Sequence, residues 1–272
     1  MGYFLNSIKK STKWIAILIC LFFVLFPIYW AISSSFKMRV DIINPEQKFI
    51  FSPTLEAYGN IFRRRETWKC FRNSLVICSI TMFLTFLLGT PASYVIGRYY
   101  FRRKDVLQFW IYSLRFLPAS AALLPFLVVW RSLGLFDTYF SICFTYLIFT
   151  LPVFIILAIQ QFKAIPPEIE EAAKLDGCGP FKVLRKISLP IVLPLLCCIA
   201  VLSFTLVWND FMFAFILTRD LTPLPVYTAA YAWIGMSVPW PEVCAIAIFL
   251  TLPPVILLVT FRRFLIQFFS GK

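Results

Sequence analysis

Residues 163–190 read KAIPPEIEEAAKLDGCGPFKVLRKISLP and form a charged segment between two long apolar runs. Pro166 and Pro167 suit the start of a helix, because a missing backbone N–H costs nothing there. Three carboxylates come directly after the prolines: Glu168, Glu170 and Glu171. Negative charges are favourable there, because the N-terminal end of a helix dipole is positive. The segment therefore predicts a short helix that starts at Pro166 or Pro167.

Charge pairing and turn residues predict how this helix continues and ends. Glu170 and Lys174 stand four residues apart in the order that favours an ion pair, worth about 0.3–0.5 kcal/mol. Gly177 and Gly179 allow the chain to stop and bend. Pro180 then suits the start of a second short helix, which carries Lys182, Arg185 and Lys186. On periodicity alone, an amphipathic anchor on the membrane surface is the alternative to a binding segment.

Composition predicts that lipid is the solvent for most of the chain. Of the 272 residues, 60% are hydrophobic and 14% are charged, and the mean hydropathy of +0.82 lies outside the soluble range. A bilayer core about 30 Å thick needs about 20 helical residues. Five uncharged runs meet this length: 14–36, 73–97, 138–162, 187–209 and 243–261. The net charge of +13 is spread over short clusters between these runs, which suits lipid head groups better than a nucleic acid.

A sixth run, 106–130, is interrupted only by Arg115, and we expect it to be the third span. The predicted fold class is all-α: a polytopic membrane protein with six transmembrane helices and with both termini on one side. Lys and Arg are more numerous on the side of the termini, which favours a cytoplasmic location for both and a place in the cell inner (plasma) membrane. A cleavable signal peptide is the alternative for 14–36, but this run is too long and lacks a cleavage site.

The residue types and motifs that the sequence lacks limit the reactions that this chain could catalyse. Histidine, the commonest zinc ligand and general base, does not occur. The eight cysteines form no C-x-x-C pair and lie mostly in apolar runs, so they predict small apolar filler and no metal site. The phosphate-binding pattern G-x-x-x-x-G-K-[ST] is missing as well. We therefore expect no catalytic residues, no metal and no cofactor in this chain, and hence no enzyme.

Fixed spacing identifies the charged segment more closely. Three residues separate Glu171-Ala172-Ala173 from Gly177, and nine more separate Gly177 from Ile187-Ser188-Leu189-Pro190. This pattern resembles the EAA loop of ABC importer permeases, which lies between two late membrane spans. The segment here lies between two such runs.

The resemblance covers nearly the whole chain and is to the carbohydrate-uptake branch, in particular to its shorter, maltose-permease-G-like partner. The similar segments are the end of the first span with Pro27, Trp30, Ser34, Ser35 and Lys37, then PTLEAYGNIF at 53–62, RNSL at 72–75, RFLP at 115–118, LGLFDTY at 133–139 and WNDFMFAFILT at 208–218. The resemblance implies a type I ABC importer permease fold with a cytosolic coupling helix. It also implies a role as the permease subunit of an ATP-driven sugar importer.

The same resemblance implies partners and roles. The expected partners are a homologous second permease, a dimer of ATP-binding subunits that would bind ATP and Mg, an extracytoplasmic solute-binding protein, and a small-molecule sugar. Glu171 would be the charged contact to the ATPase, and Gly177 the bend. Ala172 and Ala173 would form a small docking face. The chain would divide into residues 1–71 with the first span, a permease core of 72–263 with the coupling loop 163–186, and a short cytosolic tail of 264–272.

Ionisable groups at membrane depth are costly and indicate a possible substrate pathway. Asp210 stands beside Trp208 and Asn209, and such a set suits a sugar, since an aromatic face packs on the ring while amide and carboxylate bind hydroxyls. Arg115 is the second candidate. The structural alternative is that Arg115 and Asp210 pair with each other or with backbone and hold the bundle together.

Other functions remain as alternatives. The solute could be a non-sugar, such as a glycerol-phosphate derivative. An ion-coupled secondary transporter would bury several carboxylates and show repeated halves, whereas Asp210 is the single candidate here. A membrane-embedded enzyme would need a nucleophile, base or metal cluster.

Overall fold

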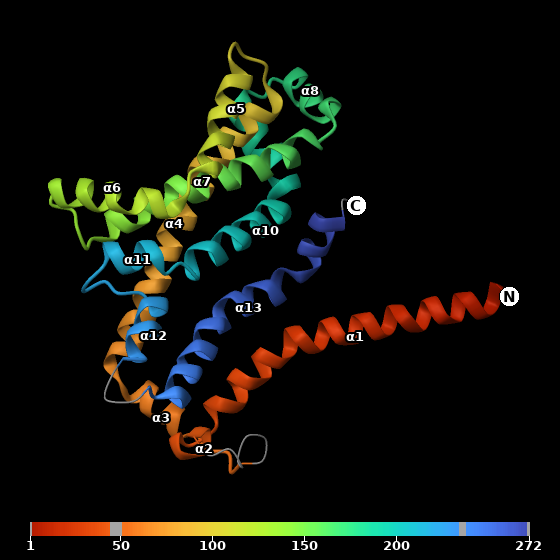
Figure 1. The fold of residues 1–272 in the computed structure, drawn as a ribbon. Helices are drawn as coiled ribbons and strands as arrows, with labels where there is room; N and C mark the ends of the chain where they lie inside the picture. Colours follow the sequence, from red (N-terminus) through yellow and green to blue (C-terminus); the bar gives the residue numbers. More distant parts are fainter. Residues whose placement is uncertain (1, 44–50, 234–237, 271–272) are drawn as a thin grey trace. The chain divides into compact units, whose positions relative to one another are not determined.

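The computed structural model describes residues 2–43, 51–233 and 238–270, and within these ranges the chain is helical without strands (Figure 1). The all-α prediction is confirmed. Helix bounds are α1 Gly2–Ser35, α2 Arg39–Ile43, α3 Glu56–Arg63, α4 Arg65–Arg98, α5 Lys104–Ser113, α6 Ala119–Ser132, α7 Tyr139–Lys163, α8 Pro167–Leu175, α9 Pro180–Val183, α10 Leu189–Trp208, α11 Met212–Leu217, α12 Leu224–Tyr231 and α13 Trp240–Ser270. A 3₁₀ turn, η2, spans Leu114–Phe116, and a π turn, η3, spans Leu184–Ser188.

Five segments of the described chain are long and apolar enough to cross a membrane. They are Thr12–Ser35, Arg65–Arg98, Tyr139–Lys163, Pro180–Trp208 and Trp240–Ile266. Each contains one of the five predicted uncharged runs, apart from a residue or two at the edges. The prediction of these five spans from length and charge is confirmed.

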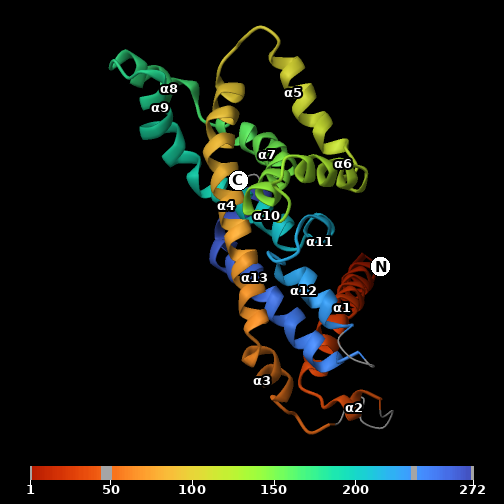
Figure 2. The ribbon, with the colours of Figure 1, turned by 90° about the vertical axis from the view of Figure 1, so that its left-hand side faces the viewer.

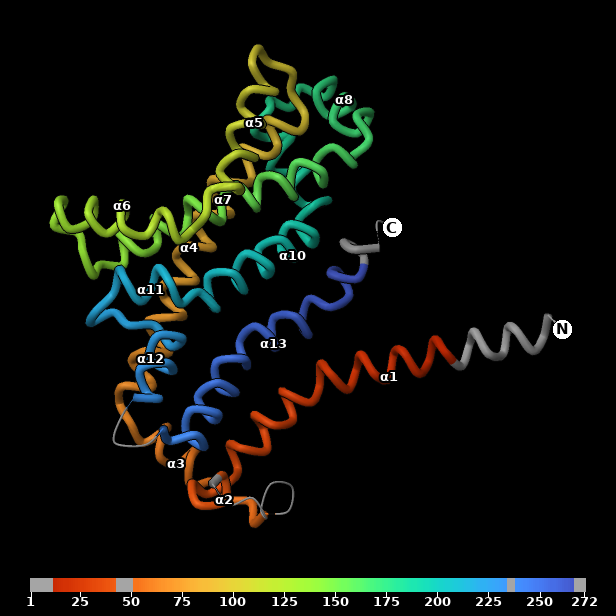
Figure 3. Tube along the Cα trace, viewed as in Figure 1, coloured from red at the N-terminus to blue at the C-terminus, as the bar shows by residue number. Residues whose placement is uncertain are grey.

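The predicted third span is not one continuous helix. Residues 106–130 fall on α5 with η2 and on α6, and these two pieces are bent by 95° relative to each other (Figures 1 and 3). Pro118 explains the break, since it disfavours the helical region for the residue before it, and Leu117 has φ −64° and ψ 117°. The described chain therefore has five continuous candidate spans. The bent pair is either a sixth, broken span or a re-entrant loop.

The chain packs as two compact units, which differ from the predicted division at 71 and 263. The first unit joins residues 1–67 to 228–251, and the second joins 68–227 to 252–272. In the first unit the start of α13 returns to the segment after α1: the Arg39 guanidinium bonds Glu242 at 2.6 Å, and the Phe62 and Phe249 rings meet edge to face. Sequence order alone does not reveal this return.

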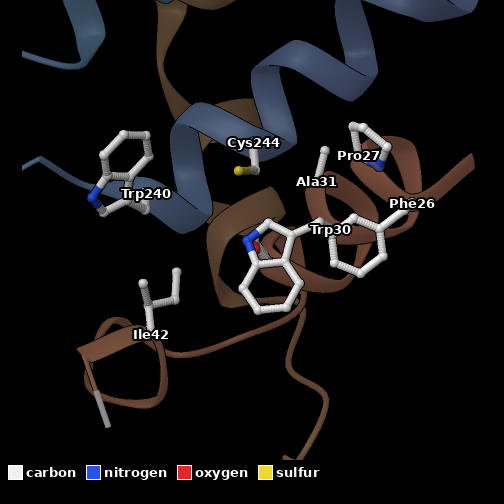
Figure 4. A pocket seen from close by; sticks show the side chains of 8 residues that line it. Phe26, Pro27, Trp30, Ala31, Ile42, Trp240 and Cys244 are labelled. Carbon is white, nitrogen blue, oxygen red and sulfur yellow. The ribbon is translucent and has the colours of Figure 1, made fainter. Parts of the chain in front are cut away.

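The first unit contains a cavity of about 530 Å³ between α1, α2 and the start of α13 (Figure 4). Its lining is almost wholly apolar and includes Phe26, Trp30 and Trp240. A sugar site needs several convergent polar groups, so this cavity suits apolar chains better than a sugar. The α1 side chains from Trp14 to Phe23 are exposed, as lipid-facing or partner-facing apolar residues are.

The second unit has a core formed by α4, α7 and α10 (Figure 2). Two glycines on α4 permit its close approach to α7. A Cβ at Gly89 would lie 2.5 Å from the Phe154 ring, and one at Gly97 would lie 3.3 Å from the Ile159 carbonyl oxygen. Small residues serve this purpose between membrane helices, because packing rather than the hydrophobic effect holds such helices together. The two helices are thus fixed against each other along their length.

The loop between α11 and α12 is held by polar side chains from α4 and from the segment just before α7. The Asp137 carboxylate accepts the backbone N–H groups of residues 219, 220 and 221 at 2.8, 2.9 and 3.2 Å. The Asn73 amide donates to the Thr222 carbonyl at 3.2 Å and accepts from the Tyr139 hydroxyl at 3.0 Å. This end of the second unit is therefore braced by one carboxylate and one amide.

The Asp137 contact predicts a measurable loss of stability. Asp137→Ala removes the acceptor of three backbone N–H groups and should lower the free energy of unfolding by about 2 kcal/mol. The thermal unfolding midpoint in detergent measures this change. Asp220→Ala, which removes an exposed carboxylate from the same loop, is the control and should leave the midpoint unchanged. Equal shifts in the two variants would contradict the assignment.

Candidate functional site

The predicted short helix is present as α8 and begins where the sequence indicates. Pro166 precedes it with φ −55° and ψ 129°, and Pro167 is its first residue. Glu168 and Glu170 occupy the first turn, where their negative charges interact favourably with the positive end of the helix dipole. The start at Pro166 or Pro167 is confirmed.

The end of α8 is a hydrogen-bonded reversal centred on Gly177. This glycine has φ +82°, a left-handed conformation that side chains disfavour. The Gly177 N–H donates to the Lys174 carbonyl and the Cys178 N–H to the Ala173 carbonyl, both at 3.0 Å, which is the Schellman arrangement. The predicted bend at Gly177 is confirmed, and α8 is capped at its C-terminal end.

A second short helix begins at Pro180, as predicted, and leads into the fourth long apolar segment. After α9 the chain passes through the π turn η3 into α10. Pro190 stands in the first turn of α10 and lacks the N–H that an uninterrupted α-helix would require. The wider π turn just before it accommodates that missing bond.

One face of α8 packs against its own chain and the other is free. Glu168, Glu171 and Ala172 are exposed, and so is Leu175 at 89%. Ala173, in contrast, is 6% exposed within the chain. In this structure Ala173 faces its own bundle, where its small side chain allows α8 to approach, and its docking role stays a prediction. Glu171 and Ala172 remain on the free face.

Glu170 is paired differently from the sequence prediction. It does not bond Lys174, but accepts from the Arg98 guanidinium Nε at 2.9 Å and from the Ser188 hydroxyl at 2.7 Å. Lys174 instead places its ammonium 5.6 Å from the centre of the Tyr99 ring. A buried carboxylate gains more from a guanidinium and a hydroxyl at hydrogen-bond distance than from a flexible surface lysine. Glu170 therefore lies on the face of α8 that packs against the bundle, whereas Lys174 stays exposed.

Sequence reasoning missed Arg98, Ser188 and the exposed apolar residues Leu175 and Phe181. Arg98 is the last residue of α4, which Figure 2 shows ending near α8 and α9. The sequence showed only that Arg98 directly follows the uncharged run 73–97. Leu175 and Phe181 could have been found, because a large apolar residue in a polar loop indicates a contact surface.

Three of the predicted pathway residues, Trp208, Asn209 and Asp210, follow one another at the end of α10, and the described contacts of Trp208 and Asp210 are with the chain itself. The Asp210 carboxylate accepts from the Tyr146 hydroxyl at 2.8 Å and from the backbone N–H groups of Phe213 and Ala214, which caps α11. Trp208 is 1% exposed, with its ring 5.3 Å from that of Phe204 and 6.0 Å from that of Phe71. In this conformation Trp208 offers no free face to a sugar ring.

Asn209 and Arg115 are the exposed members of the predicted pathway set. The Asn209 amide donates to the Thr205 carbonyl at 3.0 Å. Arg115 lies in η2, at the bend between α5 and α6. Among the described contacts, none joins Arg115 to Asp210, so the alternative of a mutual pair is wrong while that of pairing with backbone holds for Asp210. A role in the pathway stays a prediction for all four residues.

Comparison with known proteins agrees with this architecture. Residues 89–270 match the family of binding-protein-dependent transport system inner membrane components. A probable ABC transporter permease protein of Sinorhizobium fredii is 31% identical over 90% of this chain and 88% of its own. The trehalose transport system permease protein of Mycobacterium tuberculosis is 30% identical over 94% of each chain.

A solved structure shows the same fold. A bacterial ABC transporter involved in the import of the acidic polysaccharide alginate contains a chain that superimposes with a TM-score of 0.83, at 22% identity, over 95% of this chain and 96% of that one. The resemblance stated from the EAA spacing is thus confirmed along most of the sequence. The chain belongs to the family of binding-protein-dependent transport system inner membrane components, the multi-pass permeases of ABC transporters.

Proposed function

We propose that this chain is the permease subunit of an ATP-driven sugar importer and that α8 docks onto a separate ATP-hydrolysing subunit. The observation that carries the proposal is the two-sided character of α8. One face is fixed to the bundle through buried Glu170 and Ala173, while the other presents Glu171, Ala172 and Leu175. A helix that only anchored the chain to lipid would turn its apolar side, not its carboxylates, toward the membrane.

The free face of α8 fits a groove on another protein. Leu175 supplies an apolar contact, Ala172 permits close approach, and Glu171 supplies a charge for a basic residue of the partner. Pro167 fixes the backbone at the start of α8 and the Schellman bonds cap its end, so we treat the helix as a rigid element. A rigid element is needed if closure of the ATPase dimer is to move the spans.

ATP and Mg are expected on the partner subunits. The nine glycines of the chain never form G-x-x-x-x-G-K-[ST], whose backbone N–H groups would enclose phosphates. We assign no covalent chemistry to the chain itself. The remaining partners that we propose are a homologous second permease and an extracytoplasmic solute-binding protein, with both termini of this chain in the cytoplasm and the assembly in the inner membrane.

The name of the Mycobacterium tuberculosis relative supports a sugar as the solute. Asn209 and Arg115 are the exposed polar residues of the predicted pathway that could face it. A glycerol-phosphate derivative is the second candidate, and competition with labelled sugar in an uptake assay separates the two.

Co-purification and uptake test the proposal directly. The ATPase subunit should co-purify with this chain from membranes, and uptake of labelled sugar into cells should stop when ATP is depleted while a proton gradient is kept. Glu171→Arg should reduce the bound ATPase about tenfold, because charge reversal at a contact costs more than 1 kcal/mol. Uptake that persists without ATP would contradict the proposal.

Gly177 allows a sharper test with a matched control. A Cβ at Gly177 meets nothing within 4 Å, so Gly177→Asp should leave the fold intact at a cost of about 1 kcal/mol for the left-handed backbone. We expect normal amounts of protein in the membrane and no uptake, since the new side chain adds bulk and charge at the turn that ends the docking helix.

Gly134 is the control for this variant. It has φ +67°, also has open space around it, and lies before α7, whereas Gly177 lies beyond the other end of α7. Gly134→Asp therefore introduces the same side chain and the same backbone strain away from the docking surface. Its uptake should stay near that of the unaltered protein, and equal loss in both variants would show that strain alone stops transport.

A further inference from the structure

One buried carboxylate connects α8 to several spans at once. Glu170 is 3% exposed and bonds Arg98, the last residue of α4, and Ser188, at the end of η3 directly before α10. Arg98 uses Nη1 for a third bond, to the Ile165 carbonyl just beyond α7, at 2.9 Å. The ends of α4, α7 and α10 therefore meet α8 through a single ionic cluster of Arg98, Glu170 and Ser188.

We propose that Arg98, Glu170 and Ser188 are positioning residues that make α8 move as one body with the ends of α4, α7 and α10. The inference rests on the proposed function, in which α8 docks onto the ATPase. It assigns two separate tasks to adjacent glutamates: exposed Glu171 contacts the partner, and buried Glu170 transmits the movement to the spans.

The covalent connection from α8 to α10 is pliable, because it passes through two glycines. At its C-terminal end the chain continues through Gly177 and Gly179, and glycine resists backbone rotation least of all residues. A displaced α8 would bend this loop before it moved α10. The bond from Glu170 to Ser188 bypasses the loop and links the middle of α8 to the head of α10.

Close packing of α4 against α7 holds the backbone at Arg98 in place. Gly97, next to Arg98, lies so close to α7 that a Cβ there would come within 3.3 Å of the Ile159 carbonyl oxygen and the Phe162 side chain. The Arg98 backbone therefore has little freedom, and its side chain is 12% exposed. Separating a buried pair of this kind leaves a charge without compensation and is strongly unfavourable. The cluster thus keeps its geometry while the larger elements move.

The bond from Glu170 to Ser188 has most effect at the N-terminal end of α10. The π turn η3 interrupts regular helix bonding just before Pro190, and irregular turns of this kind adjust more easily than an α-helix. Without a second attachment, this turn would absorb a displacement that came through α9. Ser188 is the last residue of the turn and directly precedes α10, so its bond to Glu170 acts where the turn ends and α10 begins.

The test uses the complete transporter in proteoliposomes, with its ATPase, second permease and binding protein. Glu170→Gln keeps the shape of the side chain but removes its charge. We expect the number of sugar molecules taken up per ATP hydrolysed to fall about tenfold, the scale of a typical coupling free energy between sites. ATP hydrolysis and the amount of bound ATPase should stay within about twofold of the unaltered complex.

Asp105→Asn is the control, since it removes an exposed carboxylate at the start of α5, outside the docking face of α8. It should leave the ratio of uptake to hydrolysis unchanged. Arg98→Lys keeps the charge but loses the fork that joins Glu170 to the Ile165 carbonyl. Its ratio should lie between those of Glu170→Gln and the unaltered complex.

Ser188→Ala covers the case in which Glu170→Gln fails to fold, because it removes one hydroxyl only and should still lower the ratio about threefold. An unchanged ratio in both variants overturns the inference. So does a proportional loss of uptake and hydrolysis, which would mark the cluster as merely structural. Failure of the unaltered chain to bind any ATPase would instead refute the proposed function, so the two failures are distinguishable.

Discussion

The pairing of Arg98 with Glu170 is the constraint on which the end of the second unit around α8 depends. Charged groups this deeply buried are stable only as pairs with further hydrogen bonds, and here the Ser188 hydroxyl and the Ile165 carbonyl supply them. The pair fixes which face of α8 turns inward. Its consequence for function is that Glu171, one residue further along the helix, must face outward and is available to a partner.

Spans defined by long uncharged runs were predictable, because lipid excludes charges and requires helices of a set length. α1, α4, α7, α10 and α13 appear where the runs lie. The bend between α5 and α6 was not predicted, since a count of charges ignores the restriction that Pro118 places on Leu117. The return of 228–251 to the first unit depends on contacts distant in sequence, such as Arg39 with Glu242.

Local chemistry also made the bounds of α8 predictable, as Pro167 and Gly177 act through their own backbones. The partner of Glu170 was not, because Arg98 lies 72 residues away while Lys174 lies one turn away. The same reason applies to Ala173 and Trp208, whose burial depends on neighbours from other helices. Residue types and spacing therefore predicted which segment matters, whereas tertiary packing decided which of its side chains are free.

Site-specific photo-crosslinking in the assembled transporter tests the central claim most directly. A photoreactive phenylalanine derivative in place of Leu175, on the free face of α8, should crosslink to the ATP-hydrolysing subunit on irradiation. The same derivative in place of exposed Ser132, at the end of α6 that precedes α7, should not. An ATPase that is bound to the complex but crosslinks from position 132 and never from position 175 would contradict the account.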